Sequence, residues 1–136
     1  MDKTNKIRMM IRLALVDEQF ESNEQVLIEE LAQMEGISKE ELDQILQEEL
    51  SNKDAQILIS QNLDFDSKVG ILADLVRVMK ADGDVYLSEI KFCEMIAELF
   101  GFTQKSIGFL SKRIHGDSAI APNWELIQSS MRKYVA

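Results

Sequence analysis

Residues 80–89 have the sequence KADGDVYLSE and lie between two segments with the apolar periodicity of an amphipathic helix. These flanking segments are residues 67–79 and 90–100. The connection between them is short, and it carries three carboxylates, those of Asp82, Asp84 and Glu89. The pattern predicts a helix–acidic turn–helix unit, and we expect the rest of the chain to be organised around it.

The composition favours an all-α fold. The chain has 136 residues, of which 46% are hydrophobic and 29% charged, so it can bury a core of ordinary size. Six glycines and one proline are few for the many turns of a β fold, whereas residues that favour helices are abundant. We therefore expect a single helical domain over residues 1–136.

The targeting signals of the sequence are weak. No apolar run approaches the roughly 20 residues that a membrane span needs. The basic N-terminal segment is interrupted by Arg12 and followed by acidic residues, so it is predicted to form a first helix and not a signal peptide. We expect a cytoplasmic protein that does not insert into membranes.

The acidic charge is concentrated in the first half of the chain. The net charge is −9; residues 1–65 hold 15 acidic and 6 basic residues, whereas residues 66–136 hold 9 of each. Such a field repels nucleic acid and anionic lipid, and it suits cations or a basic protein partner. The alternative is that the excess charge serves solubility alone.

Apolar periodicity along the chain predicts about seven helices. Their approximate bounds are 3–17, 22–35, 38–50, 67–81, 87–100 and 103–115, with a final helix that follows Asn123 and ends at Tyr134. Gly36 is expected to end the second helix in the left-handed conformation, and Ser38 to cap the third. Residues 51–65 are compatible with a short helix or an extended segment.

The two halves of the sequence resemble each other at an offset of 65 residues. Residues 12–42 align with 77–107 without a gap, and six positions are identical. These identities include a turn, a helix start and a helix end, which indicates a duplication. We therefore predict two related helical units, about 3–50 and 67–115, plus a C-terminal helix. The identical pairs are Arg12/Arg77, Asp17/Asp82, Glu24/Glu89, Glu29/Glu94, Ala32/Ala97 and Gly36/Gly101.

The second copy of the unit carries a recognisable motif. It reads Asp-Gly-acid-Val-x-x-x-Glu over residues 82–89, followed by Ile-Ala-x-x-Phe-Gly-Phe over residues 96–102. This motif resembles the signature of the TerB-like family, which takes its name from a tellurite-resistance protein. The likeness covers about residues 7–115. The first copy departs from it, because Glu18 replaces the glycine and Gln19 the second acid.

The resemblance implies a fold and a broad role. It implies an all-α domain of about seven helices, a bacterial origin, and a stress-related accessory function that acts through an acidic or cation-binding surface. The biochemical role of the family is poorly defined, so the resemblance says more about the fold than about the function.

The acidic turn is the candidate site. A hard divalent cation such as calcium prefers several oxygen ligands gathered by a tight loop, which Asp82, Asp84 and Glu89 would supply. Asp17 and Glu24 would form a weaker second copy. The alternative is structural: the aspartates bond the backbone of their own turn, and Glu89, at the third helical position, reaches back to the N-cap amide.

Other polar and aromatic residues are assigned structural roles. Cys93 is expected to be a buried thiol. Glu48 and Glu49 are expected on a solvated face, and Arg12 and Arg77 are expected to pair with acids across helices. Trp124 and Tyr134 are expected to dock the last helix, although an exposed Trp124 would indicate a partner site.

The sequence contains none of the motifs that would indicate an enzyme, such as a Gly-rich phosphate loop, a His-Glu-x-x-His helix or a cysteine pair. We therefore expect a non-enzymatic accessory module with a divalent-cation site at the Asp-Gly-Asp turn. The alternative is a metal-independent protein–protein adaptor that uses a groove between helices; exposed apolar side chains in such a groove would favour it.

Overall fold

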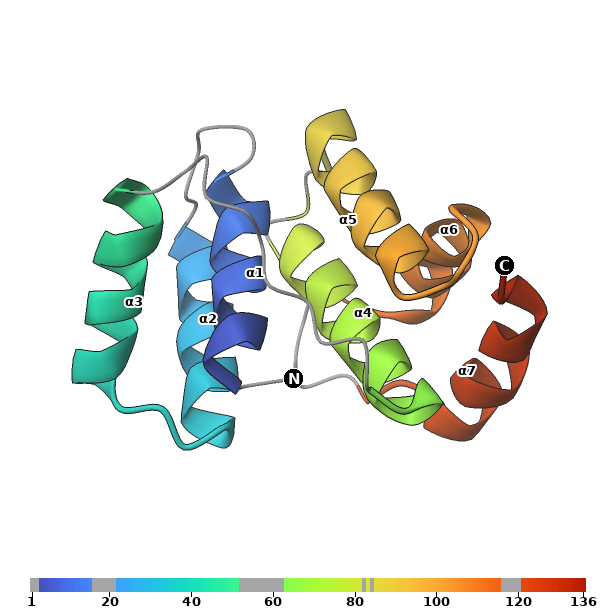
Figure 1. The fold of residues 1–136 in the computed structure, drawn as a ribbon, viewed down its shortest axis with the longest axis horizontal. Coiled ribbons are helices and arrows are strands. Elements are labelled where there is room, and N and C mark those ends of the chain that lie inside the picture. The colour runs from blue at the N-terminus through green and yellow to red at the C-terminus, as the bar shows by residue number, and fades with distance from the viewer. Residues whose placement is uncertain (1–2, 16–21, 52–62, 82, 84, 116–120) are drawn as a thin grey trace.

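The computed structural model describes residues 3–15, 22–51, 63–81, 83, 85–115 and 121–136 (Figure 1). These residues form seven α-helices and one 3-10 helix, with no β-strand among them. The predicted all-α fold is therefore confirmed. The elements are α1 (Lys3–Leu15), α2 (Ser22–Met34), α3 (Lys39–Ser51), α4 (Phe65–Met79), α5 (Leu87–Leu99), α6 (Lys105–Arg113), α7 (Trp124–Met131) and η1 (Arg132–Tyr134).

The helix bounds agree closely with the sequence pattern. The first six predicted helices each begin and end within two residues of an observed helix. The last predicted helix ends as expected at Tyr134, but its final turn is the 3-10 helix η1. The ambiguous segment 51–65 lies mostly outside the described residues; its ends belong to α3 and to the start of α4.

Helices α1 and α4 form the centre of the molecule. Helix α1 contacts α2, α3 and α4, and helix α4 contacts α5, α6 and α7. Figure 1 shows the consequence: α1–α3 lie on one side, α4–α6 on the other, and α7 packs beside the second group. Apolar burial explains the arrangement, since six residues of α1 and eight of α4 are buried.

The turns after α2 and α5 are built alike. Each contains a glycine with positive φ, +78° at Gly36 and +89° at Gly101, a conformation that favours glycine. In each turn the next N–H donates to a carbonyl five residues back, at 2.9 Å, from Ile37 to Ala32 and from Phe102 to Ala97. The local geometry thus recurs at the offset of 65 residues, whereas a shared origin of the two units stays a prediction.

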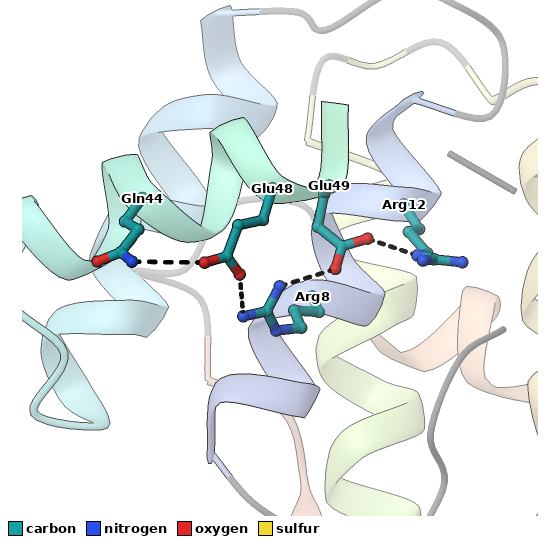
Figure 2. Close-up of polar contacts among 5 residues, drawn as sticks. All are labelled: Arg8, Arg12, Gln44, Glu48 and Glu49. Atoms are coloured by element: carbon teal, nitrogen blue, oxygen red, sulfur yellow. Dashed lines mark hydrogen bonds and ion pairs between the residues drawn. The ribbon is translucent and has the colours of Figure 1, made fainter. Parts of the chain in front are cut away.

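Charged side chains connect α1 to the end of α3. Glu49 accepts hydrogen bonds from Arg8 Nη1 at 3.0 Å and from Arg12 Nε at 2.6 Å (Figure 2). Arg8 also contacts Glu48, which is held in turn by Gln44 at 3.4 Å. The prediction of a solvated face at Glu48 and Glu49 was wrong for Glu49, whose side chain is 6% exposed, because two arginines of α1 draw it inward.

In the second unit, a different contact attaches the last helix, α6, to the first helix, α4. Ile114 stands where the 65-residue offset would place a counterpart of Glu49. Lys80 connects α4 to the end of α6 instead, because its ammonium donates to the carbonyls of Ser111 and, at 2.8 Å, of Ile114. Arg77 pairs with Asp74 of its own helix at 3.8 Å, so the predicted pairing across helices holds for Arg12 but was wrong for Arg77.

The C-terminal segment is attached through its backbone and through Tyr134. Asn123 caps α7 by accepting from the N–H of Leu126 at 3.2 Å. The N–H of Thr103 donates to Tyr134 O at 2.7 Å, and the ring of Tyr134 stacks on Phe109 with centroids 5.4 Å apart. Tyr134 therefore docks the last helix as predicted, whereas Trp124 is 37% exposed.

Removal of the Glu49 carboxylate tests the connection between α1 and α3. We expect Glu49→Ala to lower the free energy of unfolding by about 2–4 kcal/mol, because it leaves two part-buried guanidinium groups without their shared acceptor. Urea unfolding measures this value. Glu48→Ala is the matched control and should cost less than about 1 kcal/mol, because Glu48 is half exposed. Equal and small losses in both variants would contradict the assignment.

Candidate functional site

The acidic turn is described only in part. Gly83 has a φ of +85°, a conformation that favours glycine and allows a sharp exit from α4. Asp82 and Asp84, the two aspartates of the predicted cation site, lie outside the described residues, as does Asp17 of the second copy. The geometry of the predicted ligands is therefore described at Glu89 and Glu24 alone.

Glu89 adopts the structural role that the sequence allowed for. It is the third residue of α5, its exposed fraction is 2%, and its Oε1 accepts a hydrogen bond from the N–H of the N-cap residue Tyr86 at 3.3 Å. This bond satisfies one of the amides that a helix start leaves unpaired. Glu24 occupies the same position in α2 and is equally buried, at 2%.

No metal-binding group is assembled within the described residues. Nowhere in that part of the chain do three His, Cys, Asp or Glu side chains come together in a way that would hold an ion. Glu89 is directed to a backbone amide, and Glu24 has its carboxylate in the protein interior. A cation site at the turn thus rests on the sequence pattern.

A pocket of about 410 Å³ lies between α1 and α4. We call it the Lys6 pocket, after the residue at its polar end. One wall is Lys3 and Lys6, which are three residues apart on α1 and share a face. The opposite wall is a stripe of α4 with the same periodicity, formed by Ser67, Gly70, Ile71 and Asp74. The lining is completed by Glu35 after α2, Leu63 before α4 and Trp124 at the start of α7.

The polar end of the Lys6 pocket is an ion-pair cluster. Lys6 Nζ lies 2.7 Å from Asp74 Oδ2 and 3.0 Å from Glu35 Oε1, so it joins α1 to α4 and to the turn after α2. Burial of the ammonium disfavours its charged form, but the charges and hydrogen bonds of Asp74 and Glu35 outweigh this and raise the pKa of Lys6 above its ordinary value. Lys6 is therefore a fixed cation.

The lining also has an apolar part, formed by Leu63, Ile71 and Trp124, which we call the apolar end of the pocket. Gly70 adds open space, because a Cβ built there would have no neighbour within 4 Å. Gly70 is in the middle of α4, where glycine is less stable than alanine by roughly 1 kcal/mol. Part of the pocket volume therefore depends on a glycine at position 70, where helix stability alone would favour alanine.

Sequence reasoning did not find this pocket. Its residues come from four separated segments of the chain, and none belongs to the motif at residues 82–102. Two weak signals were present: a glycine inside an otherwise good helix, and two lysines in a strongly acidic half of the chain. Trp124 was the one member singled out, and its exposure was stated as the sign of a partner site.

Cys93 is a buried thiol, as predicted. Burial, together with the nearby charges of Glu89 and Glu94, raises its pKa to about 12. The sulfur therefore stays protonated at neutral pH, and the thiol, which is much less nucleophilic than the thiolate, is shielded from reagents.

Within the described residues, no helix has the length and apolar content that a bilayer span requires.

The reactivity of Cys93 provides a test of the α5 environment. At pH 8 we expect the native protein to react with a chromogenic aromatic disulfide at least about 100-fold more slowly than the same chain in urea, because both burial and the raised pKa suppress the thiolate. The rate of absorbance change measures this ratio. Similar rates in both conditions would show that α5 does not bury Cys93 in solution.

Comparisons with known proteins provide no assignment. No protein-family model, no curated protein and no solved structure matches this chain. The resemblance to the TerB-like family is therefore carried by the residues of the motif alone, and it stays a prediction.

Proposed function

We propose that this protein is a non-enzymatic binding module that takes up an apolar group of another molecule in the Lys6 pocket. One observation carries the proposal: a pocket of about 410 Å³ between two central helices, with a part-exposed tryptophan on its wall. This volume is within the range of sites that bind small ligands. Exposed apolar side chains in a groove between helices were expected to favour the adaptor hypothesis, and Trp124 is such a side chain.

Rigidity of the surroundings supports the same proposal. The pocket walls belong to α1 and α4, which form the centre of the core, and Lys6 fixes their spacing through its ion pairs. A binding site on packed helices needs little reorganisation when a ligand enters. The TerB-like resemblance adds the context: an accessory role in a bacterial stress response such as tellurite resistance.

Filling the pocket tests the proposal. We expect small apolar probes, such as indole and isobutanol, to shift the amide resonances of residues 3–6 and 67–74 in the wild type, and to lose this effect in Gly70→Leu. The substituted side chain would enter open space, so the variant should fold, with a gain of up to about 1 kcal/mol from helix propensity.

The matched control is Gly108→Leu. Gly108 is an exposed glycine inside α6, also with no atom within 4 Å of an added Cβ, and it is not part of the pocket. This variant should gain similar stability and keep the probe-induced shifts. Binding that survives Gly70→Leu, or that occurs only at other surfaces, would refute the proposed site.

A divalent cation at the Asp-Gly-Asp turn is the second candidate function. It is supported by the positive φ of Gly83, the glycine between the two aspartates of the motif. A site of this kind would use the turn between α4 and α5 and is independent of the Lys6 pocket.

A calcium titration followed by amide NMR distinguishes this candidate from counterion screening. A specific site predicts saturable shifts confined to residues 80–90, which Asp82→Asn abolishes. Asp66→Asn, which removes an exposed acid from the first turn of α4, is the control and should leave the shifts in place. Diffuse shifts over the acidic half of the chain, or no shifts, would exclude the calcium site and leave Glu89 as a helix cap.

A further inference from the structure

We propose that the Lys6 pocket recognises a free α-amino acid with an apolar side chain, such as leucine. In this arrangement Lys3 binds the carboxylate of the ligand, Glu35 binds its ammonium group, and the side chain enters the apolar end beside Trp124. The inference rests on the proposed function, since it names the ligand class of the same pocket.

The pocket lining carries equal numbers of positive and negative side chains, but not every one of them is fully paired within the described residues. Two cations, Lys3 and Lys6, face two carboxylates, Glu35 and Asp74. Lys6 is fully engaged, because it contacts both carboxylates, and Asp74 is held from its other oxygen by Arg77 at 3.8 Å. The charges of Lys6 and Asp74 are therefore satisfied within the protein and need no ligand.

The remaining capacity lies at Lys3 and Glu35. Lys3 is exposed and forms no ion pair within the described residues, and Glu35 uses Oε1 for Lys6 while its side chain stays 35% exposed. Both line the pocket, and the Lys3 ammonium lies 3.8 Å from the position of a Cβ added to Gly36, the neighbour of Glu35. One cation and one carboxylate of the pocket lining thus keep exposed surface for a ligand.

This pair of groups selects a zwitterion. A ligand with only a negative charge would approach Lys3 but would lie beside the carboxylates of Glu35 and Asp74. A ligand with only a positive charge would lie beside Lys3 and Lys6. Like charges in the same pocket repel and lower affinity. A ligand that carries both charges on one carbon can pair with Lys3 and with Glu35 at once.

The apolar end accommodates the side chain. Ile71, Leu63 and Trp124 line the same pocket as Gly70, whose missing side chain leaves open space there. The volume of about 410 Å³ holds an amino acid and leaves room for water at the polar end. The pocket therefore combines an apolar wall with a few placed charges, as small-molecule sites commonly do.

Four derivatives of leucine separate the two charges of the ligand. They are leucine, N-acetyl-leucine, leucinamide and N-acetyl-leucinamide, which carry both charges, only the negative one, only the positive one, and none. Trp124 is the only tryptophan of the chain and lines the pocket, so its fluorescence reports binding directly. At pH 7 we expect leucine to bind at least 10-fold more tightly than each of the other three.

Each contrary outcome has a distinct meaning. If N-acetyl-leucine binds as tightly as leucine or more tightly, the inference is overturned in favour of the C-terminus of a protein chain as the ligand. If leucinamide does so, it is overturned in favour of an N-terminus. Equal affinities would reduce recognition to the apolar group. No binding of any derivative, while indole still binds, would overturn the amino-acid inference and leave the proposed function standing.

Two variants connect the selectivity to the named residues. Lys3→Gln should abolish the preference for leucine over leucinamide, and Glu35→Gln the preference over N-acetyl-leucine. Lys39→Gln and Glu40→Gln, exposed residues at the start of α3 and outside the pocket, are the controls and should change neither preference. Because Glu35 also contacts Lys6, the Glu35→Gln variant is checked for an unchanged unfolding midpoint. If Lys3→Gln keeps the wild-type preference for leucine over leucinamide, the proposed role of Lys3 is refuted by that result alone.

Discussion

The packing of α1 against α4 is the constraint on which the rest of the structure depends. Each helix is the first of a three-helix group. Its buried residues contact the other two helices of its own group and also the first helix of the other group. Contact between α1 and α4 covers both at once and joins the groups into one core. The Arg8–Glu49 and Lys80–Ile114 contacts then attach α3 and α6 to these central helices.

The same packing explains why a pocket exists where it does. Apolar side chains close the contact between α1 and α4 over most of its length, but where Lys3 and Lys6 face Ser67, Gly70 and Asp74 the facing residues are polar or lack a side chain. The Lys6–Asp74 ion pair spans this part without filling it. Trp124 then borders the opening, since α7 contacts α4.

The helices could be predicted from the sequence because their signals are local. Apolar periodicity, the cap at Ser38 and the left-handed conformation of Gly36 each act within a few residues, and all were found where expected. The pocket and the burial of Glu49 could not be predicted, because they depend on contacts between residues far apart in the sequence, such as Arg8 with Glu49 and Lys6 with Asp74. Met34 shows the same limit: it continues the apolar pattern of α2 but is 82% exposed.

Native-state hydrogen exchange tests the central claim most directly. If α1 and α4 form one shared core, their slowest amides should exchange with the same free energy, equal to that of global unfolding, while the ends of α3 and α7 exchange through smaller openings. A result in which α4–α6 stay protected while α1–α3 exchange freely would contradict the account, since it would show two groups that fold independently and a pocket between α1 and α4 that is not held in place.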